Sequence, residues 1–246
     1  RTTAINYLQN VYDQRGIVRE YVKWDYEIRT GVNVQQVIYR ASQMAQSSPC
    51  GPVYLTAARE VLASETHWKE VQPLYKWPKV ERVPLLQKAV ETIVYALLEA
   101  DNPLIITSYL GRNQTAVGKL VQFCERLGIP VVEENPQYLN FPGDHPLHLG
   151  YNPLQFVKEA DVILVIDADV PWNYTTQPNL DSQVFYIDID PLKQSIPLWY
   201  MPSDRFYQAD SEIVLDQFLS FVDKIDSNSP KIAERHRRYQ EMHSQV

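Results

Sequence analysis

The chain has 246 residues, of which 45% are hydrophobic and 22% are charged, and its formal net charge is −7 with a pI near 5.3. This length accommodates one large or two small domains with a real core. The basic residues are dispersed along the chain, which argues against binding to nucleic acid. The sequence contains no stretch that approaches the ~20 apolar residues of a membrane span, so no membrane partner is expected.

The two cysteines are interpreted as unpaired thiols. Cys50 lies in a turn before a predicted strand, and Cys124 lies on an apolar helix face, without the spacing of a metal site. Unpaired thiols favour an intracellular, reducing compartment. Residues 1–7 contain no apolar signal core and no initiator methionine, so targeting is not judged from this segment.

Residues 1–65 have the pattern of the end of an α/β domain. Apolar residues at helical spacing predict a short helix within residues 1–17, and the β-rich residues 18–24 predict a strand. A helix over 33–47 stops at a Ser-Ser-Pro run, and a short buried strand follows over 53–56. Strand, helix and strand make one crossover unit of a parallel sheet. One unit cannot cover both faces of a sheet, so we expect the rest of this domain to precede residue 1.

Residues 66–84 are predicted to be a linker, because they show little periodicity and contain three prolines. Trp68 and Trp77 suggest that this linker packs along a surface.

Residues 85–226 alternate strands and helices. The strands are continuously apolar, which is typical of a doubly wound parallel sheet, so the predicted fold class is α/β and Rossmann-like. Residues 227–246 form a charged, helical segment that we interpret as a connection to a further domain. The elements predicted in the second half of the chain are helices over 85–100, 114–127 (capped by Gly128), 153–160 and 211–224, and strands over 104–108, 129–132, 161–167 and 184–189.

Ligands of doubly wound sheets bind beyond the carboxyl ends of the strands, which makes three segments candidates. The first contains Gly111 and Arg112, between a strand and a helix. Amide groups at a helix start attract anions, and Arg112 would add a phosphate contact. The alternative is an ordinary turn with Arg112 on the surface, because the segment has one glycine rather than a Gly-x-Gly-x-x-Gly motif.

The second candidate segment contains Asp167, Asp169 and Trp172. The two aspartates resemble a metal or ribose site, and Trp172 would stack on a ring. The alternative is that Asp169 caps a loop or helix and that Trp172 packs at a domain boundary.

The third candidate segment contains Asp188 and Asp190, which follow a predicted strand. An acidic residue in this place accepts hydrogen bonds from ribose or adenine. The alternative is a fold that is kept without its ligand. His145 and His148 are three residues apart but lack a third zinc ligand nearby, so no metal site is predicted.

Several of these segments resemble thiamine diphosphate (ThDP) enzymes of the acetolactate synthase type. The Gly-Pro-Val-Tyr-Leu strand over 51–55, which runs into Arg-Glu-Val-Leu over 59–62, resembles the close of the pyrimidine-binding domain of that family. The family commonly has a proline where Ala58 stands here. Residues 18–24 resemble the strand before the last helix of that domain. Ile-Asp-Ile-Asp-Pro over 187–191 resembles the closing strand of the central domain.

The resemblance implies a domain plan and an activity. Residues 1–65 would end the pyrimidine-binding domain, 66–84 would be the linker, 85–226 the central domain, and 227–246 the connection toward a diphosphate-binding domain. The parent would be a homodimer or tetramer that decarboxylates, ligates or cleaves 2-oxo acids with ThDP and Mg²⁺. The chain has no Gly-Asp-Gly motif to hold Mg²⁺, and the activating glutamate would precede residue 1. We therefore expect this segment to be a spacer without catalytic activity of its own.

The resemblance also implies a nucleotide at the central domain, where family members bind FAD or ADP. FAD is not expected, because the flavin-binding loops of the family are replaced by His-Leu-Gly-Tyr over 148–151 and by Asp-Ala-Asp-Val-Pro over 167–171. The candidate nucleotide residues are Gly111, Arg112, Asp167, Asp188 and Asp190. The alternatives are a stand-alone nucleotide-binding module of sirtuin-like topology, although the Ala-Gly-Ala motif of sirtuins is missing, and a non-catalytic scaffold.

Overall fold

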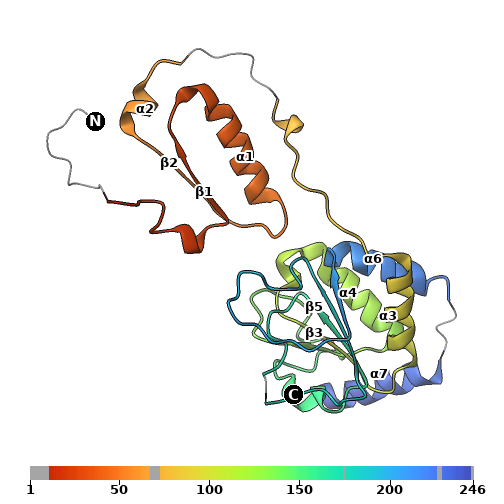
Figure 1. Cartoon of the computed structure of the whole chain (residues 1–246). Helices are drawn as coiled ribbons and strands as arrows, with labels where there is room; N and C mark the ends of the chain where they lie inside the picture. The colour runs from red at the N-terminus through yellow and green to blue at the C-terminus, as the bar shows by residue number, and fades with distance from the viewer. Residues whose placement is uncertain (1–10, 67–72, 174, 226–228, 245–246) are drawn as a thin grey trace. The chain divides into compact units, whose positions relative to one another are not determined.

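The computed structural model describes residues 11–66, 73–173, 175–225 and 229–244 (Figure 1). The chain divides into two compact units, residues 1–81 and 82–246. Each unit has its own secondary structure and is described by itself.

The first unit is built on one parallel strand pair, β1 (Trp24–Ile28) and β2 (Val53–Ala57), in which Trp24 pairs with Val53. The helix α1 (Val34–Gln46) crosses between the strands and packs on them through Val37 and Ala41, which are buried. This arrangement confirms the predicted crossover unit. A short helix, α2 (Arg59–Ala63), follows β2.

One expectation for the first unit is wrong, and another is tested only in part. The strand predicted over 18–24 lies further along the chain, and a 3₁₀ turn, η1 (Arg19–Tyr21), takes its place. The reason is pairing: Lys23 donates its backbone N–H to Pro52, and the ladder with β2 begins at Trp24. Of the helix predicted within 1–17, residues 1–10 lie outside the described part, and residues 11–17 form turns instead.

The linker contains a short 3₁₀ helix, η3 (Leu74–Lys76). Trp77 packs against Tyr39 of α1, with ring centroids 5.8 Å apart, so this part of the linker contacts the first unit. Trp68 lies outside the described residues.

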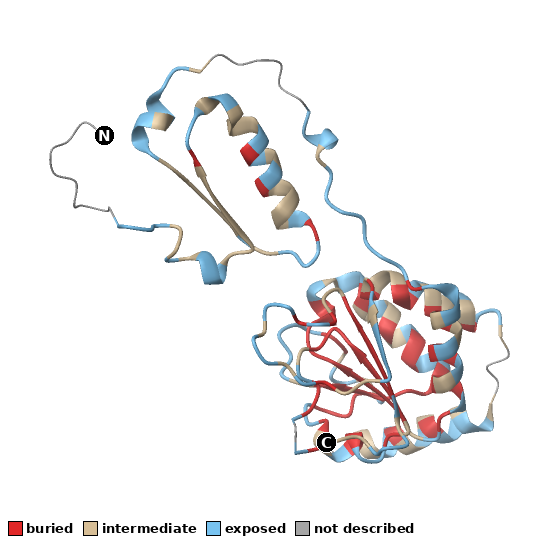
Figure 2. Ribbon diagram, viewed as in Figure 1, coloured by how far each residue is buried: buried red, intermediate tan, exposed pale blue. Residues whose placement is uncertain are grey.

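The second unit is a five-stranded parallel sheet in the order β4-β3-β5-β6-β7, which confirms the predicted α/β fold class. The central strand, β5 (Val162–Ile166), is buried at every position (Figure 2). Helices α3, α4 and α6 pack together beside the sheet, and long connections lie on the other side (Figure 1). The other elements are β3 (Pro103–Thr107), β4 (Val131–Glu133), β6 (Gln183–Asp188), β7 (Arg205–Gln208), α3 (Gln87–Glu99), α4 (Gln114–Leu127), α5 (Leu154–Val157), α6 (Ser211–Val222) and α7 (Pro230–His243).

Two details of the second unit differ from expectation. The strand β7 was not predicted, because its residues are polar or half-exposed and lack an apolar run; it exists through its pairing with β6. The helix α5 is also shorter than the predicted span of 153–160. Gly128 caps α4 in a left-handed conformation with φ of 62°, which confirms the predicted helix end.

The charged helix α7 packs against the ends of other helices of the second unit. Its Arg235 is buried and donates hydrogen bonds to the carbonyl oxygens of Leu98 and Leu127, each at 2.9 Å, and of Ala100. These carbonyls lie at the ends of α3 and α4, where helices leave acceptors unpaired. A role as connection to a further domain stays a prediction. None of the helices in the described residues has the length and hydropathy of a membrane span.

Candidate functional site

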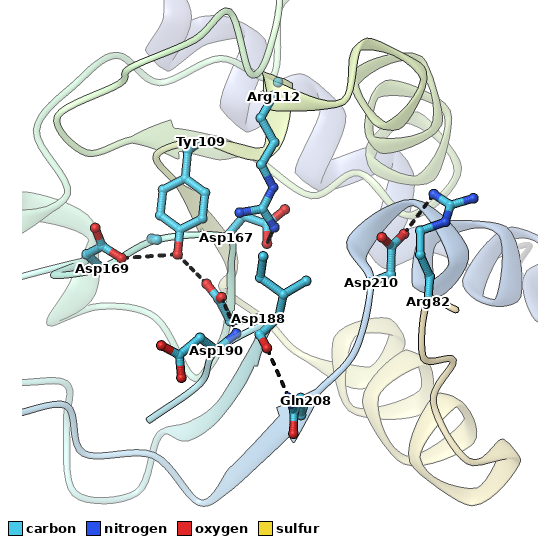
Figure 3. Close-up of polar contacts among 12 residues, drawn as sticks. Arg82, Tyr109, Arg112, Asp167, Asp169, Asp188, Asp190, Gln208 and Asp210 are labelled. Carbon is cyan, nitrogen blue, oxygen red and sulfur yellow. Dashed lines mark hydrogen bonds and ion pairs between the residues drawn. The ribbon is translucent and has the colours of Figure 1, made fainter. Parts of the chain in front are cut away.

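The candidate residues of the second unit gather at the carboxyl edge of its sheet (Figure 3). The strands β3, β5 and β6 lie side by side in the sheet; Tyr109 and Asp167 follow β3 and β5, and Asp188 is the last residue of β6. The backbone carbonyl of Asp167 accepts the N–H groups of Ser108 and Tyr109, each at 3.0 Å, which locks the ends of β3 and β5 together.

Arg112 and Asp167 contact each other directly. Nη2 of Arg112 lies 2.8 Å from Oδ1 of Asp167. The guanidinium stacks over the Tyr109 ring, with its Cζ atom 4.9 Å from the ring centre. Asp167 is fully buried and holds a φ of 52°, a left-handed conformation that aspartate tolerates better than most residues. Burial raises the pKa of Asp167 to about 6, although Arg112 acts in the opposite direction.

Asp188 is the centre of a second buried cluster. Its Oδ2 accepts hydrogen bonds from Lys193 Nζ at 2.8 Å and from the Tyr109 hydroxyl, and its Oδ1 accepts the N–H of Asp190 at 2.8 Å. Lys193 Nζ also lies 2.8 Å from Oδ1 of Asp169. Burial raises the pKa of Tyr109, and the negative charge of Asp188 adds to this rise. The tyrosine therefore remains a neutral hydrogen-bond donor.

Asp190 lies at the rim of this cluster and is partly exposed. Its Oδ2 accepts the N–H of Gln194 at 3.1 Å, so the side chain closes the turn after β6. The neighbouring carbonyl of Ile189 accepts a hydrogen bond from Gln208 of β7 at 3.2 Å.

Gly111 packs against the loop over residues 138–140. Its N–H donates to Oδ1 of Asn140 at 2.8 Å, and a Cβ atom at Gly111 would lie 2.1 Å from the carbonyl oxygen of Leu139. The single glycine of this turn is thus required for the close approach of residues 138–140.

Trp172 is 4% exposed and belongs to the core of the second unit, so it packs inside this unit rather than at a domain boundary, and no face of it is free for stacking. The half-exposed Asp169 accepts the indole N–H of Trp199 at its backbone carbonyl, at 2.8 Å.

Sequence reasoning missed Tyr109, Lys193 and a buried network behind Gly111. In this network Nε2 of His148 lies 3.0 Å from Oε1 of Glu133, and Nδ2 of Asn140 donates to Oε2 of Glu133 at 2.7 Å. No local sequence pattern predicts these contacts, because the residues that make them come from different elements. His145 pairs instead with Glu125, at 3.3 Å. The described residues contain no group of three His, Cys, Asp or Glu side chains placed to hold a metal ion.

Of the sequence-predicted residues, the structure therefore brings Arg112 to Asp167 and Asp188 to Asp190, and it places Gly111 against loop 138–140. All five lie at one edge of the sheet. Their binding of a cofactor stays a prediction.

Comparisons with known proteins agree with this fold. Residues 90–217 match the family described as thiamine pyrophosphate enzyme, central domain. The acetolactate synthase large subunit of Buchnera aphidicola is 24% identical over 198 residues, which cover 73% of this chain and 34% of that protein. Glyoxylate carboligase of Escherichia coli O157:H7 is 29% identical over 162 residues, which cover 64% of this chain and 26% of that protein.

A solved structure gives the same result. Benzoylformate decarboxylase from Polynucleobacter necessarius matches with a TM-score of 0.69 and 26% identity, over 84% of this chain and 40% of that chain. The chain therefore spans well under half the length of these relatives.

Proposed function

This chain belongs to the thiamine pyrophosphate enzyme family, and we propose that it supplies the central domain of an enzyme that acts on 2-oxo acids with ThDP and Mg²⁺. The family match over residues 90–217 carries this proposal. The names of the relatives support the substrate class, because glyoxylate and benzoylformate are both 2-oxo acids. The reaction would be decarboxylation, carboligation or C–C cleavage at the keto carbon, and ThDP would serve as the electron sink.

We assign the second unit the role of a spacer between two cofactor-binding domains. The sequence has no Gly-Asp-Gly motif, and the described residues offer no set of ligands for Mg²⁺. The residues present do not fit the diphosphate–metal group, so no chemical step is assigned to them. Burial of the sheet edge by its own side chains supports a structural role.

We propose that residues 1–65 complete the pyrimidine-binding domain. The parallel pair β1–β2 with its crossover helix α1 supports this, because two strands alone form a marginal sheet and pack best as part of a larger one. The helix α7 would lead toward the diphosphate-binding domain.

We further propose that the parent enzyme forms a homodimer or tetramer and works in a reducing, intracellular compartment. Both cysteines are free thiols: Cys50 is exposed, and Cys124 is buried in α4. Free thiols persist in compartments that keep cysteines reduced.

An adenine nucleotide at the sheet edge is the second candidate function. Arg112 and Asp190 are partly exposed and would be the groups to reach it. The internal hydrogen bonds of Gly111 and Asp188 argue against this ligand.

An assay on protein from its natural source tests the main proposal. The protein is isolated with an antibody against the second unit, and the loss of pyruvate, glyoxylate and benzoylformate is followed with and without ThDP and Mg²⁺. We expect turnover of at least one acid that requires both additions, and none from the 246-residue chain expressed alone. A natural protein that consumes none of these acids, or a chain that is active alone, would overturn the proposal.

A further inference from the structure

We propose that the chain's own side chains occupy the nucleotide corner of this sheet, so that the second unit binds no adenine nucleotide there. The corner is defined as the turn over 109–112 together with Asp167 and Asp188–Asp190. This inference rests on the proposed function, since it describes how a central domain serves as a spacer without a ligand. It is carried by contacts at the phosphate end of the corner, which is the turn over 109–112 with Asp167, and at the ribose end, which is Asp188–Asp190.

At the phosphate end, the backbone amide groups that would hold an anion already donate hydrogen bonds within the chain. The Gly111 N–H donates to Asn140 Oδ1 at 2.8 Å, so a neutral amide oxygen stands where a phosphate oxygen would bind. Asn140 is fully buried, and its Nδ2 is held by the Ser108 carbonyl at 3.0 Å and by Glu133 at 2.7 Å. The carbonyl of Leu139 fills the space beside the Gly111 Cα atom.

The start of α4 is closed in the same way. Asn113 caps the helix by accepting the N–H of Thr115 at 3.2 Å, and the Arg112 N–H donates to the Tyr109 carbonyl at 3.1 Å. The guanidinium of Arg112 is paired with the buried Asp167 and stacked on Tyr109. The cation expected to neutralise a phosphate is therefore committed to an internal carboxylate.

At the ribose end, the acceptor atoms of Asp188 are also taken. Lys193 and Tyr109 donate to Oδ2, and the Asp190 N–H donates to Oδ1. Lys193 is 6% exposed, and its Nζ lies 4.9 Å from the centre of the Tyr109 ring. A ribose hydroxyl would have to displace a buried ammonium from Asp188, which leaves this buried carboxylate without its cation.

Hydrogen exchange of single amides, combined with titration calorimetry, tests the inference on the unmodified chain. We expect the Gly111 amide to be protected, and ADP, NAD⁺ and FAD to give no saturable heat up to about 1 mM. Saturable ADP binding that slows exchange at Gly111 would overturn the inference. Binding that leaves Gly111 unchanged would place the nucleotide elsewhere and would support it.

A second readout does not depend on nucleotides. Acetylation by an amine reagent should be about tenfold slower at Lys193 than at the exposed Lys79, with or without ADP. Equal reactivity would show an open corner and contradict the inference.

The variant Asn140→Ala adds a direct test. Its Gly111 amide should exchange about tenfold faster, while amides of β5 keep their rates. If the variant does not fold, the measurements on the unmodified chain still decide. None of these readouts involves ThDP or a 2-oxo acid, so a failed turnover assay would overturn the proposed function and leave this result untouched.

Discussion

Lys193 and Asp188 form an ion pair at 2.8 Å in which both side chains are more than nine-tenths buried. The two residues bracket the turn after β6, and Tyr109 from the end of β3 completes the cluster. This pair closes the ribose end of the corner, and through Tyr109 it links β6 to β3, two strands that do not pair with each other.

The first prediction concerns this ion pair. Lys193→Met leaves the carboxylate of Asp188 buried without its cation, so we expect the free energy of unfolding to fall by about 3–5 kcal/mol. The double variant Lys193→Met with Asp188→Asn should recover part of this loss, because it removes both charges. Urea unfolding of the chain measures the difference. A loss below about 1 kcal/mol in the single variant would show that the pair is exposed to water in solution.

The second prediction concerns the pH dependence of Asp167. Its pKa is about 6 in the folded chain against 3.8 for an unperturbed aspartate, so the folded state binds the proton more tightly. The contribution of this group to stability is therefore full below pH 3.8 and is lost as the pH rises toward 6.

Asp167→Asn removes this titration. Between pH 4 and pH 7 the unfolding free energy of the unmodified chain should fall by about 2 kcal/mol relative to that of the variant. Parallel denaturant titrations at the two pH values measure this change. A difference between the two proteins that does not vary with pH would contradict the prediction.

The third prediction concerns Gly111. Gly111→Ala places a methyl group against the Leu139 carbonyl, so loop 138–140 must shift, and we expect a loss of about 1–3 kcal/mol in the free energy of unfolding. Gly118→Ala is the matched control, because this exposed position in α4 has no atom within 4 Å of the new methyl group. The control should stabilise the chain by about 0.5–1 kcal/mol. Equal effects of the two substitutions would show that loop 138–140 does not pack on Gly111.

The fourth prediction concerns α7. Arg235→Ala leaves three buried carbonyl groups at the ends of α3 and α4 without their donor, which we expect to cost about 3 kcal/mol or more. Arg237→Ala, on the exposed face of the same helix, is the control and should leave the thermal midpoint nearly unchanged. Thermal unfolding compares the two variants. An unchanged midpoint for Arg235→Ala would mean that α7 is not docked.

Sequence patterns predicted the elements whose signal is local. The continuous apolar run of β5 and the glycine cap of α4 both appear where expected, because burial and φ depend on the residue itself. Strand β7 was missed, since its residues are polar or half-exposed and only the pairing with β6 defines it. The position of β1 was wrong because its register is set by β2.

The candidate site was predicted in outline for the same reason. The acidic residues Asp167 and Asp188 lie directly after and at the end of apolar strands, which local sequence reveals. Their partners are not local: Tyr109 is 79 residues from Asp188, and Asn140 is 29 residues from Gly111. Only the strand order brings these side chains together. Their hydrogen bonds occupy the groups that the sequence predicted to bind a ligand.

The intact mass of the protein isolated from its natural source tests the central claim most directly. A central domain that serves as a spacer needs the cofactor-binding domains on either side of it. We predict a mass well above the 28.6 kDa of these 246 residues, with this sequence inside it. A natural protein of 28.6 kDa would contradict the account.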